Sequence, residues 1–120
     1  MQRSVLDEFL ALLEPAVLGV RVEDPSLDTS EMGPLISAGH HATVSSFITD
    51  STNVVIQGQV PPGPGYWYPA TVVMPSSEDD PLMTEEVFGP VVSVMAFDDE
   101  ADAIRLSNAT DYGLSGSIWT

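Results

Sequence analysis

Residues 91–119, VVSVMAFDDEADAIRLSNATDYGLSGSIW, decide the fold that this sequence predicts. Val91–Phe97 is almost continuously apolar, which is typical of a strand buried on both faces of a sheet. Asp98 or Asp99 then caps a helix, and Leu114–Trp119 follows as a second strand. Strand, helix and strand at this spacing predict a right-handed βαβ unit. The expected fold class is therefore α/β, with a mostly parallel sheet.

Upstream of this unit, the first part of the chain predicts a helix. Ser4 followed by Asp7 resembles a capping box, in which short polar side chains satisfy free backbone donors. We expect Pro15 to kink or end this helix, because proline lacks a backbone donor and clashes with the preceding turn. Apolar residues recur at helical spacing and predict the buried face: Val5, Phe9, Leu12, Leu13 and Ala16.

The middle of the chain predicts a second helix and two strands. Ser37 is placed to cap the helix, and Val44 lies on its expected buried face. The β-branched run Asn53–Gln57 predicts one strand, and the aromatic and β-branched run Tyr66–Met74 predicts another. Pro69 favours the edge of the sheet for this second strand, since it cannot donate to a ladder.

Both ends of the sequence suggest a domain that continues beyond them. The chain starts within a few residues of a helix and stops at Thr120, in or just after a predicted strand. A parallel apolar strand needs cover on both faces, and few helices are available to supply it. We therefore expect residues 1–120 to form one partial domain, truncated at both ends.

Composition excludes several kinds of chemistry. The chain has no cysteine, and its three cationic side chains are Arg3, Arg21 and Arg105. Disulfides, thiolate metal sites, a cysteine nucleophile, a lysine Schiff base and a P-loop are thus excluded within this chain. A formal charge of −15 disfavours nucleic acid and anionic lipid as partners. With no apolar run near the ~20 residues of a membrane span and no signal peptide, we expect a soluble cytoplasmic protein.

Two groups of residues could carry a site. His40 and His41 are adjacent on a predicted helix, where side chains diverge by about 100°, so we expect no metal site there. We expect the pair instead to lie at the helix surface or to support a loop. Glu86 offers two acceptor oxygens to a vicinal diol such as a ribose, and Phe88 shares its side in an extended segment. From residue types alone, a surface acid beside a core phenylalanine is the more ordinary interpretation.

The run EEVFGPV at residues 85–91 resembles a signature of the aldehyde dehydrogenase superfamily. Further segments in family order extend this resemblance over nearly the whole chain. Those segments are Arg3–Phe9, Met32–Ser37 with His40 and Val44, Gly65–Trp67 with Thr71 and Val72, and Phe97–Leu114.

The resemblance implies an enzyme that oxidises aldehydes to carboxylic acids with NAD or NADP. In the family, a cysteine thiolate attacks the aldehyde, a hydride passes to the nicotinamide, and a glutamate-activated water releases the acid. Glu86 matches the glutamate that binds the nicotinamide ribose, and Phe88 matches the aromatic residue near the nicotinamide. The matching cysteine would precede Met1, so this chain resembles a fragment of the catalytic domain with no catalytic residue, inactive in isolation.

Two alternatives to the enzyme fragment stay open. The chain could be a non-catalytic interaction module that docks on a full-length relative, because an uncovered sheet edge recruits partners. It could also be a decayed sequence with no selected role. For the enzyme fragment, the expected partners are an aldehyde substrate and a nicotinamide cofactor. The expected protein partner is either another copy of the chain, in a homo-oligomer, or a missing complementary chain.

Overall fold

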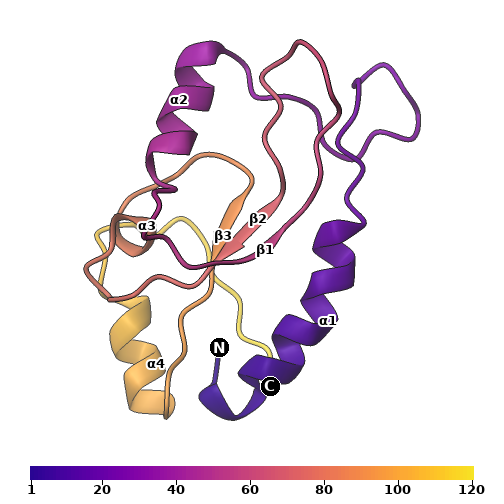
Figure 1. The fold of residues 1–120 in the computed structure, drawn as a ribbon. Coiled ribbons are helices and arrows are strands. Elements are labelled where there is room, and N and C mark those ends of the chain that lie inside the picture. The colour runs from indigo at the N-terminus through magenta and orange to yellow at the C-terminus, as the bar shows by residue number, and fades with distance from the viewer.

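The computed structural model describes residues 1–120 as a three-stranded sheet with helices on both sides. Figure 1 shows the sheet between α1 on one side and α2, α3 and α4 on the other. None of these helices is both long and apolar enough to cross a membrane. In chain order, the elements are the 3₁₀ helix η1 (Arg3–Val5), α1 (Leu6–Leu18), α2 (Ala38–Ser46), β1 (Val54–Gln57), β2 (Thr71–Val73), α3 (Pro81–Thr84), β3 (Val91–Ser93) and α4 (Glu100–Ser107).

The sheet has the order β1-β2-β3, with β1 antiparallel and β3 parallel to the central strand. Helices with a sheet agree with the predicted α/β class, although the sheet is mixed and not mostly parallel. A parallel strand–helix–strand connection does occur, from β2 through the short α3 to β3. It therefore lies one strand earlier in the chain than the sequence predicted.

The predicted βαβ unit over residues 91–119 is wrong in its strands and right in its helix. Only Val91–Ser93 pairs as a strand, and Val92 is 56% exposed instead of buried. Leu114–Trp119 forms no strand, because no other segment of the chain offers it backbone partners. Between them, Asp99 caps α4 as expected and accepts a hydrogen bond of 2.9 Å from the Asp102 amide.

The core lies where α1 packs on the sheet. Leu6 of α1 joins Ile56, Val72 and Val94 in one buried cluster. The predicted buried face of this helix was partly wrong, since Leu12 is 71% exposed. Counted from the buried Leu6, the positions that face the sheet lie three, four, seven and eleven residues later, which is the spacing of one helix face. The side chains of α1 packed on the cluster are Phe9, Leu10, Leu13 and Val17.

The capping box predicted at the start of α1 was wrong, and of the kink or end predicted at Pro15 the end was wrong. Ser4 lies within η1, and no side chain caps α1, so the capping box does not form. Pro15 does not end the helix, which continues to Leu18. Proline removes only its own backbone donor. The carbonyl of Pro15 still accepts a hydrogen bond of 3.0 Å from the Gly19 amide, which completes the last turn.

The second helix and first strand form as predicted, whereas the next strand sits elsewhere. Ser37 caps α2, and Val44 is fully buried on it. The strand predicted over Tyr66–Met74 shortens to Thr71–Val73 and is central, not at an edge. Pro69 lies before the paired residues, so its missing donor costs the ladder nothing.

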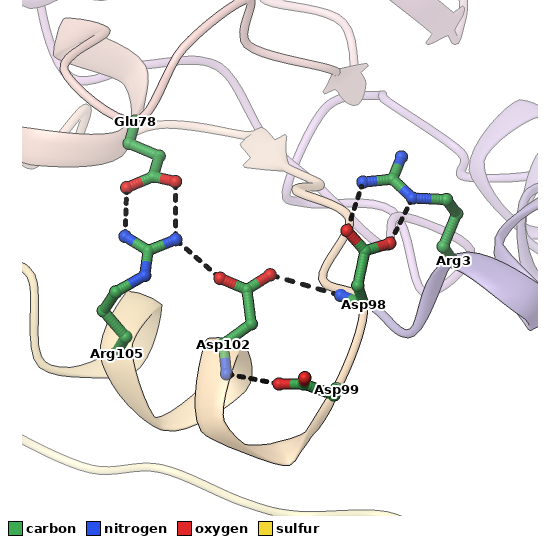
Figure 2. A network of polar contacts seen from close by, with 6 residues as sticks. All are labelled: Arg3, Glu78, Asp98, Asp99, Asp102 and Arg105. Atoms are coloured by element: carbon green, nitrogen blue, oxygen red, sulfur yellow. Dashed lines mark hydrogen bonds and ion pairs between the residues drawn. The ribbon is translucent and has the colours of Figure 1, made fainter.

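Exposed ion pairs fasten α4 to the rest of the fold (Figure 2). Arg105 of α4 makes two contacts with Glu78, at 2.5 and 2.7 Å, and one of 2.6 Å with Asp102. Arg3 contacts Asp98, just before the helix, at 2.5 Å. Exposed ion pairs stabilise a fold only slightly. Their geometry nevertheless joins the N-terminus, the loop before α3 and α4.

Acid should loosen this network. Hydrogen bonds from Arg105 lower the pKa of both Glu78 and Asp102. A carboxyl pKa that is lower in the folded state stabilises the fold above the unfolded value, about 4, and this contribution is lost as the pH falls through the folded value. We expect the urea midpoint to fall on acidification below about pH 5, and to fall less steeply in Glu78→Gln. Glu14→Gln, at an exposed site without an ion pair, is the control, and equal slopes for Glu78→Gln and the parent would contradict the prediction.

Candidate functional site

Residues 85–90, called here the 85–90 loop, connect α3 to β3 and are fixed at both ends. At its start, the amide of Glu85 donates a hydrogen bond of 2.9 Å to the carbonyl of Pro81, and the adjoining helix α3 is held to β3 by a bond of 2.7 Å from the Ser93 hydroxyl to the carbonyl of buried Leu82. At its end, the carbonyl of Pro90 accepts one of 2.9 Å from the amide of Thr71, in the central strand. The loop is therefore a short bridge with anchored ends.

The tip of this loop lies against α2. Phe88 has a φ of 45°, and it is the only residue other than glycine with a positive φ. Gly89 follows, and a Cβ added there would lie 2.8 Å from Cγ2 of the fully buried Val44. Glycine is thus favoured at 89, because a Cβ there would overlap the Val44 side chain of α2 unless one of them shifts.

The two adjacent histidines contact different parts of the molecule. Nε2 of His40 lies 2.6 Å from the carbonyl oxygen of Phe88, with the two rings 6.1 Å apart. His41 packs edge-on against Tyr68 at 5.5 Å, and its Nδ1 lies 3.3 Å from the hydroxyl of Ser45. The side chains diverge as helix geometry predicts. No group of three histidine, cysteine or acidic side chains is placed to hold a metal ion.

The two residues predicted to contact a cofactor both lie at the surface. Glu86 is exposed, and its carboxylate has no hydrogen-bond or ion-pair partner within the chain. Phe88 is 74% exposed, so the ordinary interpretation of a core phenylalanine is wrong. Glu86 and Phe88 would share one side only on an extended backbone, and the positive φ at Phe88 ends that alternation. Their role as a cofactor contact stays a prediction.

Glu85 and Glu86 face different surroundings although they are neighbours in the sequence. Glu85 lines a hollow beside the end of α2 that is rich in hydroxyl groups, and Glu86 does not. The other residues lining this hollow are Ser46, Phe47, Thr49, Ser51, Thr52, Ser76, Asp80 and Pro81. A change at Glu85 therefore serves as a matched control for a change at Glu86.

The sequence predicted that the two histidines lie at a helix surface or support a loop, and His40 does support one. What sequence reasoning missed is which loop, because nothing in the local pattern of His40 indicates a contact 48 positions away. The available signal was the spacing of His40 and Val44, because residues four apart lie on one face of a helix. His40 contacts the carbonyl of Phe88, and Val44 lies beside the next residue, Gly89.

The close approach at Gly89 gives a direct test. Gly89→Ala should lower the free energy of unfolding by about 1–3 kcal/mol, because the new methyl group overpacks against Val44. The cost should shrink in a Val44→Ala background, where the methyl group has room. Gly113→Ala is the control, since no atom lies within 4 Å of a Cβ there. Urea unfolding measures all four variants, and an equal cost of Gly89→Ala in both backgrounds would refute the packing account.

Comparison with known proteins places this geometry in a family. A family model with the description "Aldehyde dehydrogenase family" matches residues 1–120. The chain is 34% identical over 125 residues to betaine aldehyde dehydrogenase 2 of Rhizobium meliloti (strain 1021). It is 35% identical over 125 residues to lactaldehyde dehydrogenase of Escherichia coli (strain K12). Each alignment covers 100% of this chain and 26% of the relative.

Solved structures agree. Aldehyde dehydrogenase from Bacillus cereus (E194S mutant) superposes with a TM-score of 0.90 and 28% identity, covering 99% of this chain and 25% of that one. Betaine aldehyde dehydrogenase from Staphylococcus aureus, in complex with NAD+, gives a TM-score of 0.85 at 30% identity, covering 94% and 24%. The chain thus spans about a quarter of the length of these relatives. It belongs to the aldehyde dehydrogenase family.

Proposed function

We propose that the chain is part of the catalytic domain of an NAD(P)-dependent aldehyde dehydrogenase, which oxidises an aldehyde to a carboxylic acid. The family match over residues 1–120 supports this function. The single observation that carries it is the 85–90 loop, which presents a free carboxylate and an exposed ring at a fixed place beside the sheet. A cytoplasmic location, expected from the sequence, stays a prediction.

The exposed groups of the loop suit the nicotinamide end of such a cofactor. The Glu86 carboxylate has two acceptor oxygens free of partners in the chain, which fits a pair of ribose hydroxyls. The Phe88 ring is open to contact with a flat apolar surface. The bound cofactor would accept a hydride from the substrate. Glu86 and Phe88 would fix its orientation, which supplies the near-attack geometry on which hydride transfer depends.

The thiolate chemistry of the family has no source in this chain, which contains no cysteine. We therefore propose that the isolated chain is inactive and that its residues serve to position the cofactor in a complete enzyme. The expected substrate partner there is an aldehyde. Of the relatives, one is named for betaine aldehyde and one for lactaldehyde, so their names do not single out one aldehyde.

A second candidate function is an interaction module that docks on a full-length relative or a second copy of the chain. It is favoured by large apolar side chains that are left exposed, since such surfaces mark contact sites. They include Leu12, Ile36, Leu114, Ile118 and Trp119. A stable, monodisperse monomer in sedimentation experiments would count against this module and leave the enzyme fragment as the account.

The activity of the isolated chain can be assayed directly. The purified chain should form no NADH from NAD and an aldehyde, because it supplies no thiolate. Activity should appear when a chain carrying the dinucleotide-binding domain and the cysteine loop is added. NADH absorbance measures both arms. Turnover by the chain alone would overturn the proposal, and a neighbouring reading frame that encodes the cysteine loop would support it.

The affinity of the complete enzyme for its cofactor tests the role of Glu86. Glu86→Gln should weaken cofactor affinity about ten- to a hundredfold, since a hydrogen bond to a charged group contributes about 1.5–3 kcal/mol. Glu85→Gln, in its separate hollow, should change the affinity little. Calorimetry on the isolated chain should show NAD binding far weaker than micromolar. Equal effects of the two glutamine variants would remove Glu86 from the site.

A further inference from the structure

We propose that His40 is a positioning residue for the cofactor site: its imidazole holds the Phe88 peptide in the conformation that presents the 85–90 loop. The inference rests on the proposed function, because it assigns a task to a residue behind the cofactor contacts. His40 itself is not catalytic: it hydrogen-bonds the loop backbone and lies beside the Phe88 ring, and it is not one of the groups proposed to meet the cofactor.

The direction of the hydrogen bond follows from its acceptor. A carbonyl oxygen can only accept, so the 2.6 Å contact with Phe88 requires the proton on Nε2 of His40. Its other ring nitrogen, Nδ1, is enclosed and has no partner in the chain. The ring is placed by the start of α2, where the His40 amide donates to the capping hydroxyl of Ser37 at 3.1 Å. The cap thus sets the position of the donor.

The bonded carbonyl belongs to the one residue with an unusual backbone. A φ of 45° at Phe88 is rarely adopted by residues with side chains, so surrounding contacts must hold it. Two such contacts meet at the next peptide unit: His40 binds its carbonyl, and Val44 packs against Gly89. His40 and Val44 are four residues apart on one face of α2, so the same helix face binds the Phe88 carbonyl and lies beside Gly89.

Loss of the His40 donor should remove its hydrogen bond to the Phe88 carbonyl. The Phe88 carbonyl would turn to water, and its φ could return to the negative region that such residues prefer. The ring of Phe88 and the carboxylate of Glu86 would then change their relative orientation, although neither side chain has been altered. A cofactor contact that depends on both would weaken through a residue it never touches.

Two substitutions separate the donor from the ring. His40→Gln keeps an amide N–H near the position of Nε2, whereas His40→Phe keeps a flat ring beside Phe88 and lacks the donor. Amide-to-Hα coupling and short-range proton contacts, measured by NMR on the labelled chain, report the φ of Phe88. We expect a positive φ in the parent and in His40→Gln, and its loss in His40→Phe. A positive φ in all three would overturn the inference.

A measurement without any variant guards against a His40→Phe chain that fails to fold. Nitrogen chemical shifts of the imidazole in the parent should show the proton on Nε2 of His40. A proton found on Nδ1 alone would overturn the inference. Signals of the buried Val72 and Val73, which belong to β2 and not to α2 or the loop, show whether each variant retains the fold.

Titration with nicotinamide mononucleotide separates this inference from the proposed function. We expect shifts at Glu86 and Phe88 in the parent and in His40→Gln, with affinity at least severalfold weaker in His40→Phe. Unchanged affinity in His40→Phe, despite a lost positive φ, would overturn the positioning role. Absence of shifts in the parent with an intact positive φ would instead overturn the cofactor contact proposed for this loop, and the positioning role with it.

Discussion

The pairing of β2 on both of its sides is the constraint on which the rest of the structure depends. Thr71, Val72 and Val73 are all buried, and each faces a partner in β3 while the same strand pairs with β1. The amide of Thr71 binds the carbonyl of Pro90, and the carbonyl of Val73 binds the amide of Val94. Three residues therefore fix both the end of the 85–90 loop and the path of the chain toward α4.

A fixed end alone does not determine how the loop presents its side chains. That depends on α2, which the sheet does not hydrogen-bond and which reaches the loop through His40 and the buried Val44. Pairing with β2 fixes where the 85–90 loop ends, and the contacts with α2 fix its backbone conformation. Because the two supports come from segments far apart in the chain, the exposed Glu86 and Phe88 can be both accessible to a ligand and held in place.

Local chemistry could be predicted from the sequence, whereas choices made by distant partners could not. Ser37 and Asp99 cap helices because each side chain meets an amide three residues away. Leu114–Trp119 has the composition of a strand but no strand beside it, so its propensity is not realised. Pro69 indicated an edge, yet the ladder begins beyond it. The left-handed Phe88 depends on a helix nearly fifty residues earlier, which no local pattern encodes.

Charge limits what this part of the protein can contact. Every arginine is already paired: Arg3 with Asp98, Arg21 with Glu31, and Arg105 with Glu78. With no other cationic side chain and a formal charge of −15, the chain offers no free positive group to a pyrophosphate and repels it at long range. A dinucleotide held by this surface would therefore meet it through its nicotinamide and ribose, where a carboxylate acceptor is an advantage. Its phosphates would need helix N-termini or cations supplied by another part of a complete enzyme.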